Sequence, residues 1–227
     1  PSWAPDGSRL SYCQYNARSG QWEIWIVEVA NPGNKKFITV GLYPVWCPSP
    51  AVDRIAFQQA RRRGTRLFGI WTVDLVGDEA RYPTEIVPPH GNTAALAPAW
   101  SPDGSNLVYT TVDLVEKTDP ATGEKQPQRV ERGNDVWVTS LDGSCRVRLT
   151  GDDTADWNPV WASDGRIYFT SDRSGSDNIW SLKPTDTRLI RATTIGPSRV
   201  GSANGPQSAA EGASREEAQS GEVEANQ

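Results

Sequence analysis

The chain has 227 residues, of which 37% are hydrophobic, and its ten tryptophans, 20 glycines and 17 prolines are typical of a β-rich domain with many turns and not of a helical bundle. Its formal net charge of -5 excludes the basic surface with which proteins hold nucleic acid or an anionic membrane. No apolar run approaches the ~20 residues of a membrane-spanning helix.

One pattern recurs four times along the chain: a strand that ends in tryptophan, then a tight turn, then a strand of alternating polarity. The four copies are PSWAPDGSRLSYC (1–13), YPVWCPSPAVDRIAF (43–57), APAWSPDGSNLVYT (97–110) and NPVWASDGRIYFT (158–170). Their tryptophans lie 43, 54 and 61 residues apart, at Trp3, Trp46, Trp100 and Trp161. This spacing predicts four structural units of similar build.

Two further strands follow each copy. The first has a central tryptophan, in EIWIVEV (23–29), GIWTVDL (69–75), DVWVTSL (135–141) and NIWSL (178–182). The second, looser strand closes the units, as in KKFITV (35–40), RVRLT (146–150) and TRLIRAT (187–193). Four short strands per unit predict an all-β fold, a β-propeller built from four-stranded antiparallel blades.

The propeller is expected to occupy residues 1–193. Its blades are predicted at about 1–42, 43–96, 97–157 and 158–193. Residues 194–227 lack aromatic side chains and have few large aliphatic ones, so we expect them to form a disordered polar tail. Such a tail is a solvated linker or, as the sharper alternative, a docking peptide.

The turn in the repeated motif has a structural explanation. Pro102 presets φ at the first corner, Asp103 accepts the second corner, and Gly104 supplies a position with φ > 0. The second copy has no glycine in its turn (49–53), and the fourth has Ala162 in place of proline. We interpret the motif as structural and expect its tryptophans to pack between neighbouring blades. The residues that carry it are Trp3, Trp46, Trp100, Trp161, Asp6, Gly7, Asp103, Gly104, Asp164 and Gly165.

These residues resemble the TolB-like propeller repeat, whose hallmark is P-x-W-S-P-D-G followed by an I-A-F-like strand and an I-Y/W-V-like strand. The match covers roughly residues 1–193 and implies a propeller of four-stranded antiparallel blades. Propellers with this repeat include a periplasmic component of the Tol-Pal envelope system and the gating propellers of prolyl oligopeptidase and tricorn peptidases. The resemblance therefore indicates a fold more directly than a function.

Propellers of this family usually have six or more blades, whereas the sequence contains four copies of the repeat. Two arrangements follow: the C-terminal part of a larger propeller, or a four-bladed ring closed by side-chain packing. We expect the first, because a free blade edge would expose unpaired N–H and C=O groups.

The longest connections are predicted to lie on one face of the propeller. Blade topology places the loops between second and third strands, and those between blades, on the same face, which therefore receives residues 76–96 and 112–134. Long loops gathered on one face of a repeat protein predict a binding face, and tolerated surface insertions are the alternative. The candidate partner-binding residues there are Arg61, Arg62, Arg63, Arg66, Glu116, Lys117, Lys125, Arg129 and Arg132.

No catalytic, cofactor or metal site is predicted. The sequence has one histidine, His90, and contains neither a G-x-S-x-G nucleophile motif nor a zinc-binding motif. We therefore interpret His90 as an exposed loop residue. The acidic stretches 152–156 and 172–178 do not follow the spacing of a calcium loop. The three cysteines lack metal-type spacing and are interpreted as small buried residues: Cys13, Cys47 and Cys145.

The predicted function is that of a non-catalytic scaffold that binds a protein partner on the loop-rich face, with no cofactor. The resemblance to TolB-like envelope proteins implies an exported or periplasmic protein. The alternative is a regulatory or gating propeller of a prolyl oligopeptidase-like or tricorn-like peptidase. Catalysis in a central channel is disfavoured, because the first strands of the units read P-S-W, P-V-W, P-A-W and P-V-W and offer no ionisable group.

Overall fold

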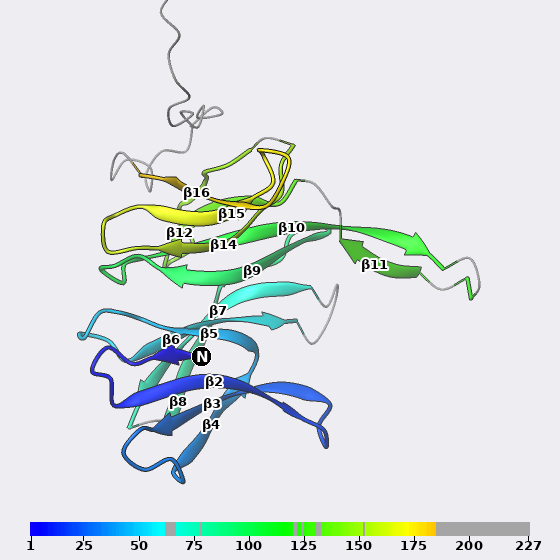
Figure 1. The fold of residues 1–227 in the computed structure, drawn as a ribbon. Coiled ribbons are helices and arrows are strands. Elements are labelled where there is room, and N and C mark those ends of the chain that lie inside the picture. Colours follow the sequence, from blue (N-terminus) through cyan, green and yellow to red (C-terminus); the bar gives the residue numbers. More distant parts are fainter. Residues whose placement is uncertain are drawn as a thin grey trace, which may run out of the picture.

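The computed structural model, drawn in Figure 1, consists of strands and turns. It describes residues 1–61, 67–77, 79–119, 122–123, 125–129, 133–151 and 153–184. Within these residues there are four antiparallel sheets and no helix, which confirms the prediction of an all-β propeller with four blades. The predicted tail over 194–227 and the closing strand over 187–193 lie outside the described residues.

Each sheet is one blade, with its strands hydrogen-bonded in chain order. Blade 1 contains β1 (Ser2–Trp3), β2 (Arg9–Asn16), β3 (Gln21–Glu28) and β4 (Lys35–Val40). Blade 2 contains β5 (Leu42–Trp46), β6 (Arg54–Ala60), β7 (Phe68–Val76) and β8 (Glu79–Val87). Blade 3 contains β9 (Thr93–Trp100), β10 (Asn106–Thr118), β12 (Asp135–Ser140) and β13 (Arg146–Arg148), with β11 (Lys125–Arg129) added beside β10. The described strands of blade 4 are β14 (Asp156–Trp161), β15 (Ile167–Ser171) and β16 (Asn178–Leu182).

The two long connections predicted from the sequence are largely strands. The prediction of a loop over 76–96 is wrong: residues 79–87 form β8, the fourth strand of blade 2, and only five residues then lead to β9. The prediction of a loop over 112–134 is also corrected. The second strand of blade 3 continues to Thr118 and returns as β11, so the insertion contains a β-hairpin that extends the blade.

The blades are stacked face to face in the order of the sequence. Figure 1 shows blade 1 at one end of the stack and blade 4 at the other. Extensive contacts join each blade to the next, mainly through the first strands: β5 packs on blade 1, β9 on blade 2 and β14 on blade 3. Packing between successive blades therefore holds the molecule together.

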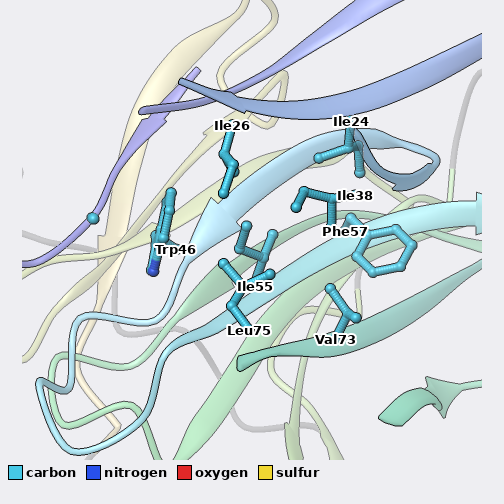
Figure 2. Packing of buried hydrophobic residues seen from close by; sticks show 9 residues of the cluster. Ile24, Ile26, Ile38, Trp46, Ile55, Phe57, Val73 and Leu75 are labelled. Carbon is cyan, nitrogen blue, oxygen red and sulfur yellow. The ribbon is translucent and has the colours of Figure 1, made fainter. Parts of the chain in front are cut away.

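The hydrophobic core is divided into three clusters, one at each contact between blades. Figure 2 shows the cluster between blades 1 and 2, where Ile24, Ile26 and Ile38 face Phe57 and Val73. The second cluster joins blades 2 and 3, and the third joins blades 3 and 4. Alternation along each strand sends apolar side chains to both faces of a central blade, which explains why the second blade contributes to two clusters.

The tryptophans of the repeated motif pack against the preceding blade. Trp46 and Trp100 are 4% and 6% exposed, and Nε1 of Trp100 donates to the carbonyl oxygen of Val45 in blade 2 at 3.0 Å. Trp161 packs against the cluster between blades 3 and 4. Trp3 is 58% exposed, since the described residues include no blade before blade 1.

The first strands of blades 2, 3 and 4 bend at the residue before their proline. Tyr43, Ala97 and Asn158 have φ angles of 52°, 50° and 51°, and the strand register shifts at each of these points. A positive φ is rare for a residue with a Cβ, and a following proline restricts the backbone further. The Ala97 N–H donates to Oε1 of Gln58, a buried side chain of blade 2, at 2.9 Å. The bend in blade 3 is thus held by its neighbour.

Three of the four turns between first and second strands share one hydrogen-bond pattern. In blades 1, 3 and 4, a glycine with φ between 70° and 79° follows an aspartate whose Oδ1 accepts the N–H of the residue after the glycine, at 2.9–3.0 Å; the turn of blade 2 has no glycine. The three sets are Asp6-Gly7-Ser8, Asp103-Gly104-Ser105 and Asp164-Gly165-Arg166. Asp142, between β12 and β13, makes the same bond to Ser144 at 3.0 Å.

Candidate functional site

Of the four arginines predicted to bind a partner in blade 2, the structure describes Arg61. Its guanidinium forms a two-point ion pair with Glu85 on β8, with Nε–Oε1 and Nη2–Oε2 distances of 2.9 and 2.6 Å. Hydrogen bonding to Glu85 raises the pKa of Arg61. The charge of Arg61 is therefore paired within its own blade. Three of the predicted residues lie outside the described part of the chain: Arg62, Arg63 and Arg66.

The hairpin formed by β10 and β11 projects from blade 3, as Figure 1 shows. Its pairing runs from Leu114 opposite Arg129 to Thr118 opposite Lys125. At its base, the Leu114 N–H donates to the carbonyl oxygen of Asn92, in the loop between blades 2 and 3, at 2.9 Å. The hairpin is therefore anchored to blade 3 by strand continuity and to the neighbouring loop by a hydrogen bond.

The predicted residues of this hairpin are only partly described. Lys125 is exposed at the start of β11, and Val115 on β10 is 45% exposed. Arg132 lies outside the described residues. The backbone of three others is placed within the two strands: Glu116, Lys117 and Arg129.

A buried ion pair in blade 4 was not predicted from the sequence. Asp156 at the start of β14 is fully buried, and both of its carboxylate oxygens lie 3.0 Å from Nη2 of Arg173. The guanidinium of Arg173 lies over the rings of Phe169 and Trp180, 5.3 and 5.2 Å from their centroids. The contact of the Arg173 guanidinium with these two rings stabilises the buried arginine further, which explains why a charged pair is tolerated in this position.

A second ion pair lies at the start of β12. Asp135 Oδ2 is 2.7 Å from Nη2 of Arg148, while burial raises the pKa of Asp135 against the opposing effect of that arginine. In both ion pairs the aspartate is the first residue of a strand. This position is the feature of the sequence that could have indicated the pairs, but it is not part of the repeated motif. Among the described residues, no group of three or more His, Cys, Asp or Glu side chains is arranged to hold a metal ion.

The histidine and the three cysteines considered in the sequence lie in loops and in the packed sheets of the fold. His90 is exposed, as its loop position predicts, and exchanges backbone hydrogen bonds with Thr93. All three cysteines are free thiols, but only Cys47 is fully buried; Cys13 and Cys145 are half-buried. Burial raises the pKa of the Cys47 thiol. No helix in the described ranges is long and apolar enough to cross a membrane.

Comparison with known proteins shows which solved structures have a similar fold. No family model matches the chain. It is 29% identical over 114 residues to the Tol-Pal system protein TolB of Bordetella pertussis, which covers 37% of this chain and 26% of that protein. A solved protein from Agrobacterium tumefaciens, provisionally assigned as TolB, superposes with a TM-score of 0.57 at 18% identity over 81% of this chain and 57% of the other.

A solved prolyl endopeptidase superposes almost equally well, with a TM-score of 0.56 at 17% identity over 81% of this chain and 26% of the other. The chain thus spans little more than half of the A. tumefaciens protein and about a quarter of the other two. These likenesses agree with the four blades observed here. The chain has a TolB-like β-propeller fold.

Proposed function

We propose that the chain is a non-catalytic propeller scaffold that binds a protein partner on the face carrying the β10–β11 hairpin, and that residues 1–193 form its propeller. The observation that carries the proposal is the hairpin itself, which projects from blade 3 (Figure 1) and presents the exposed side chains of Val115 and Lys125. Projecting segments on a rigid repeat scaffold are common sites of partner binding.

The mode of contact follows from the edge strand. Among the described strands, β11 pairs with β10 alone, so no described strand covers its other edge. Pro127 lies in the middle of β11 and removes a backbone donor there. Proline in an edge strand discourages strand addition. The partner is therefore expected to contact side chains of the hairpin rather than to extend the sheet.

The surroundings of the first strands favour a scaffold over an enzyme. β5 and β9 carry no side chain that is charged near neutral pH. β14 begins with Asp156, but this carboxylate is bound by Arg173 and fully buried. A general base needs a carboxylate that can reach substrate, and Asp156 does not meet this requirement.

The likeness to TolB supports an exported, envelope-associated protein, with the partner in the same compartment. The likeness to a prolyl endopeptidase, at nearly the same TM-score, favours a second candidate in which the propeller regulates a peptidase. In that case the partner of the hairpin is the peptidase itself or its substrate.

A hairpin-less variant tests the proposal. Leu114 and Arg129 lie directly opposite each other, so residues 115–128 can be replaced by Asn-Gly, a sequence suited to a two-residue turn. The pairing of β10 with β9 and β12 ends at Asp113 and is untouched, so the far-ultraviolet circular dichroism should be retained. Partner capture from extracts of the source organism should be lost. Retained capture would contradict the proposal.

Site-specific photocrosslinking separates specific binding from adhesion. A benzoyl-phenylalanine at Val115 should give one discrete adduct in cells, whereas the same group at Tyr82, which is 74% exposed on β8, should give none. Equal adducts at the two positions would count against the hairpin as the binding element. Mass spectrometry of the adduct distinguishes an envelope protein from a peptidase.

A further inference from the structure

The face of blade 1 that points away from blade 2 is apolar. The pairing of β1, β2 and β3 places five side chains on it: Trp3, Leu10, Tyr12, Trp25 and Val27. Trp3 is 58% exposed and the other four are half-buried. Blade 2 packs on the opposite face, through Ile24 and Ile26, and blade 1 forms one end of the stack in Figure 1. No described strand therefore covers the five side chains, and contiguous apolar faces of this kind mark interaction surfaces.

The same five positions are buried against a neighbouring sheet in the other blades. The strand register identifies them in blade 2 as Trp46, Ile55, Phe57, Trp71 and Val73. In blade 3 they are Trp100, Leu107, Tyr109, Trp137 and Thr139. In blade 4 they are Trp161, Ile167, Phe169, Trp180 and Leu182. Their second-strand members are at most 2% exposed, because each set packs on the preceding blade. The repeat thus shows that the natural cover of this face is another blade of the same kind.

The complementary face is exposed at the other end of the stack, on blade 4. Ile70 in blade 2 and Val136 in blade 3 lie on the face that receives the next blade, and both are 0% exposed. Their counterpart in blade 4 is Ile179, which is 79% exposed. Val160 lies on the same face and is 57% exposed. One chain therefore carries both halves of a contact that it makes three times internally.

We propose that two copies of this chain associate head to tail, with blade 4 of each copy packed on blade 1 of the other. A single copy does not make this contact itself, since the two faces lie at opposite ends of the stack (Figure 1). Two copies cover both faces of each chain and close a ring with twofold symmetry. Four blades from each copy give eight, which is within the usual range for propellers.

The composition of the two faces favours a second copy over an unrelated partner. Interfaces of obligate homodimers resemble a domain core divided in two, and these faces have the same pattern as the three core clusters. The contact uses blades 1 and 4, whereas the proposed partner-binding hairpin belongs to blade 3, so the two proposals are independent. Below the dissociation constant of the dimer, the molecule is the open stack of Figure 1, with two end blades.

Sedimentation velocity at a series of concentrations provides the first test. The mass should approach twice the 24.9 kDa of one chain at high concentration and return to that of one chain on dilution. The mass of a single chain throughout the micromolar range would overturn the proposal.

Two variants test the faces separately. W3E and I179E each place a charge at an exposed position, so both should fold, which circular dichroism checks. Each should weaken association at least about tenfold, because an unpaired charge is then buried in the contact. V76E is the matched control: Val76 at the end of β7 is 59% exposed and lies in blade 2, away from the contact, so this variant should dimerise like the native chain.

Mixing the two variants shows which faces meet. W3E keeps an intact blade 4 face and I179E keeps an intact blade 1 face, so the mixture should form a dimer that neither variant forms alone. An unfolded variant could not restore the dimer, so this result does not depend on separate proof of folding. Native-like dimerisation of I179E alone would show that the two copies meet through their blade 1 faces, and the head-to-tail proposal would be wrong.

Discussion

Aspartate side chains close four of the turns in this molecule by accepting a backbone N–H two residues later. These hydrogen bonds lower the pKa of Asp6, Asp142 and Asp164. At Asp103, burial raises the pKa, but hydrogen bonds from Ser101 and Ser105 outweigh it and the net pKa is lowered. Each turn is therefore stabilised by an ionised carboxylate, which links the stability of the fold to pH.

The strongest case is Asp142, whose pKa falls from 3.8 to about 2 because Ser140 and Ser144 donate hydrogen bonds to it. Between these two values the unfolded chain binds the proton more readily than the folded chain. The stabilisation is therefore complete above pH ~4 and is lost as the pH falls towards ~2. D142N retains an acceptor oxygen but cannot titrate, so it should flatten the pH dependence of the unfolding free energy in this window.

Chemical denaturation at a series of pH values checks this prediction. D177N is the matched control, since it removes an exposed carboxylate that makes no hydrogen bond within the described residues. An acid profile of D142N that superposes on that of the native chain would rule out a role for Asp142.

At the scale of the element, neighbouring turns pack against one another. The turn of blade 3 lies against that of blade 2: a Cβ on Gly104 would come 2.6 Å from Sγ of Cys47 and 3.0 Å from Cβ of Ser49. Gly7 occupies the same place in blade 1, with nearly the same φ, but a Cβ there would meet nothing within 4 Å. The two glycines differ only in what lies beside them.

This pair separates backbone strain from crowding. G7A should reduce the unfolding free energy by about 1 kcal/mol, the usual penalty of a left-handed conformation in a residue with a Cβ. G104A should reduce it by about 3 kcal/mol, because overpacking against Cys47 adds to the same strain. Equal losses in urea denaturation of the two variants would show that the contact between the turns contributes nothing.

The sequence predicted those elements that carry the repeated tryptophan. It missed β8, because E-A-R-Y-P-T-E-I-V has an internal proline and no clear alternation of polarity. It missed the β10–β11 hairpin because a projecting hairpin buries little and so needs no apolar pattern. The Asp156–Arg173 pair joins the first residue of β14 to the loop after β15, 17 positions later, a contact that spacing alone does not reveal.

At the scale of the whole molecule, stability is distributed over three contacts between four blades. Each end blade contributes to one cluster, whereas each central blade contributes to two. In such an array the end units open with a lower free energy than the central ones. The opening reactions that expose the amides of β2 and β15 should therefore have a free energy at least about 1 kcal/mol lower than those that expose the amides of β6 and β10.

Native-state hydrogen exchange followed by mass spectrometry measures this difference directly. A single opening free energy for all strands would show instead that the four blades unfold as one cooperative unit.

The division of the core into three clusters also bears on how such a chain can change over generations. Because each contact is a self-contained fit between two adjoining sheets, duplicating or losing one unit alters the number of contacts without redesigning those that remain. Recombination within a short link such as 88–92 would exchange whole units and leave every sheet intact. A blade grafted from a relative has to match only the two faces that it meets, so new loops can be acquired on an old framework.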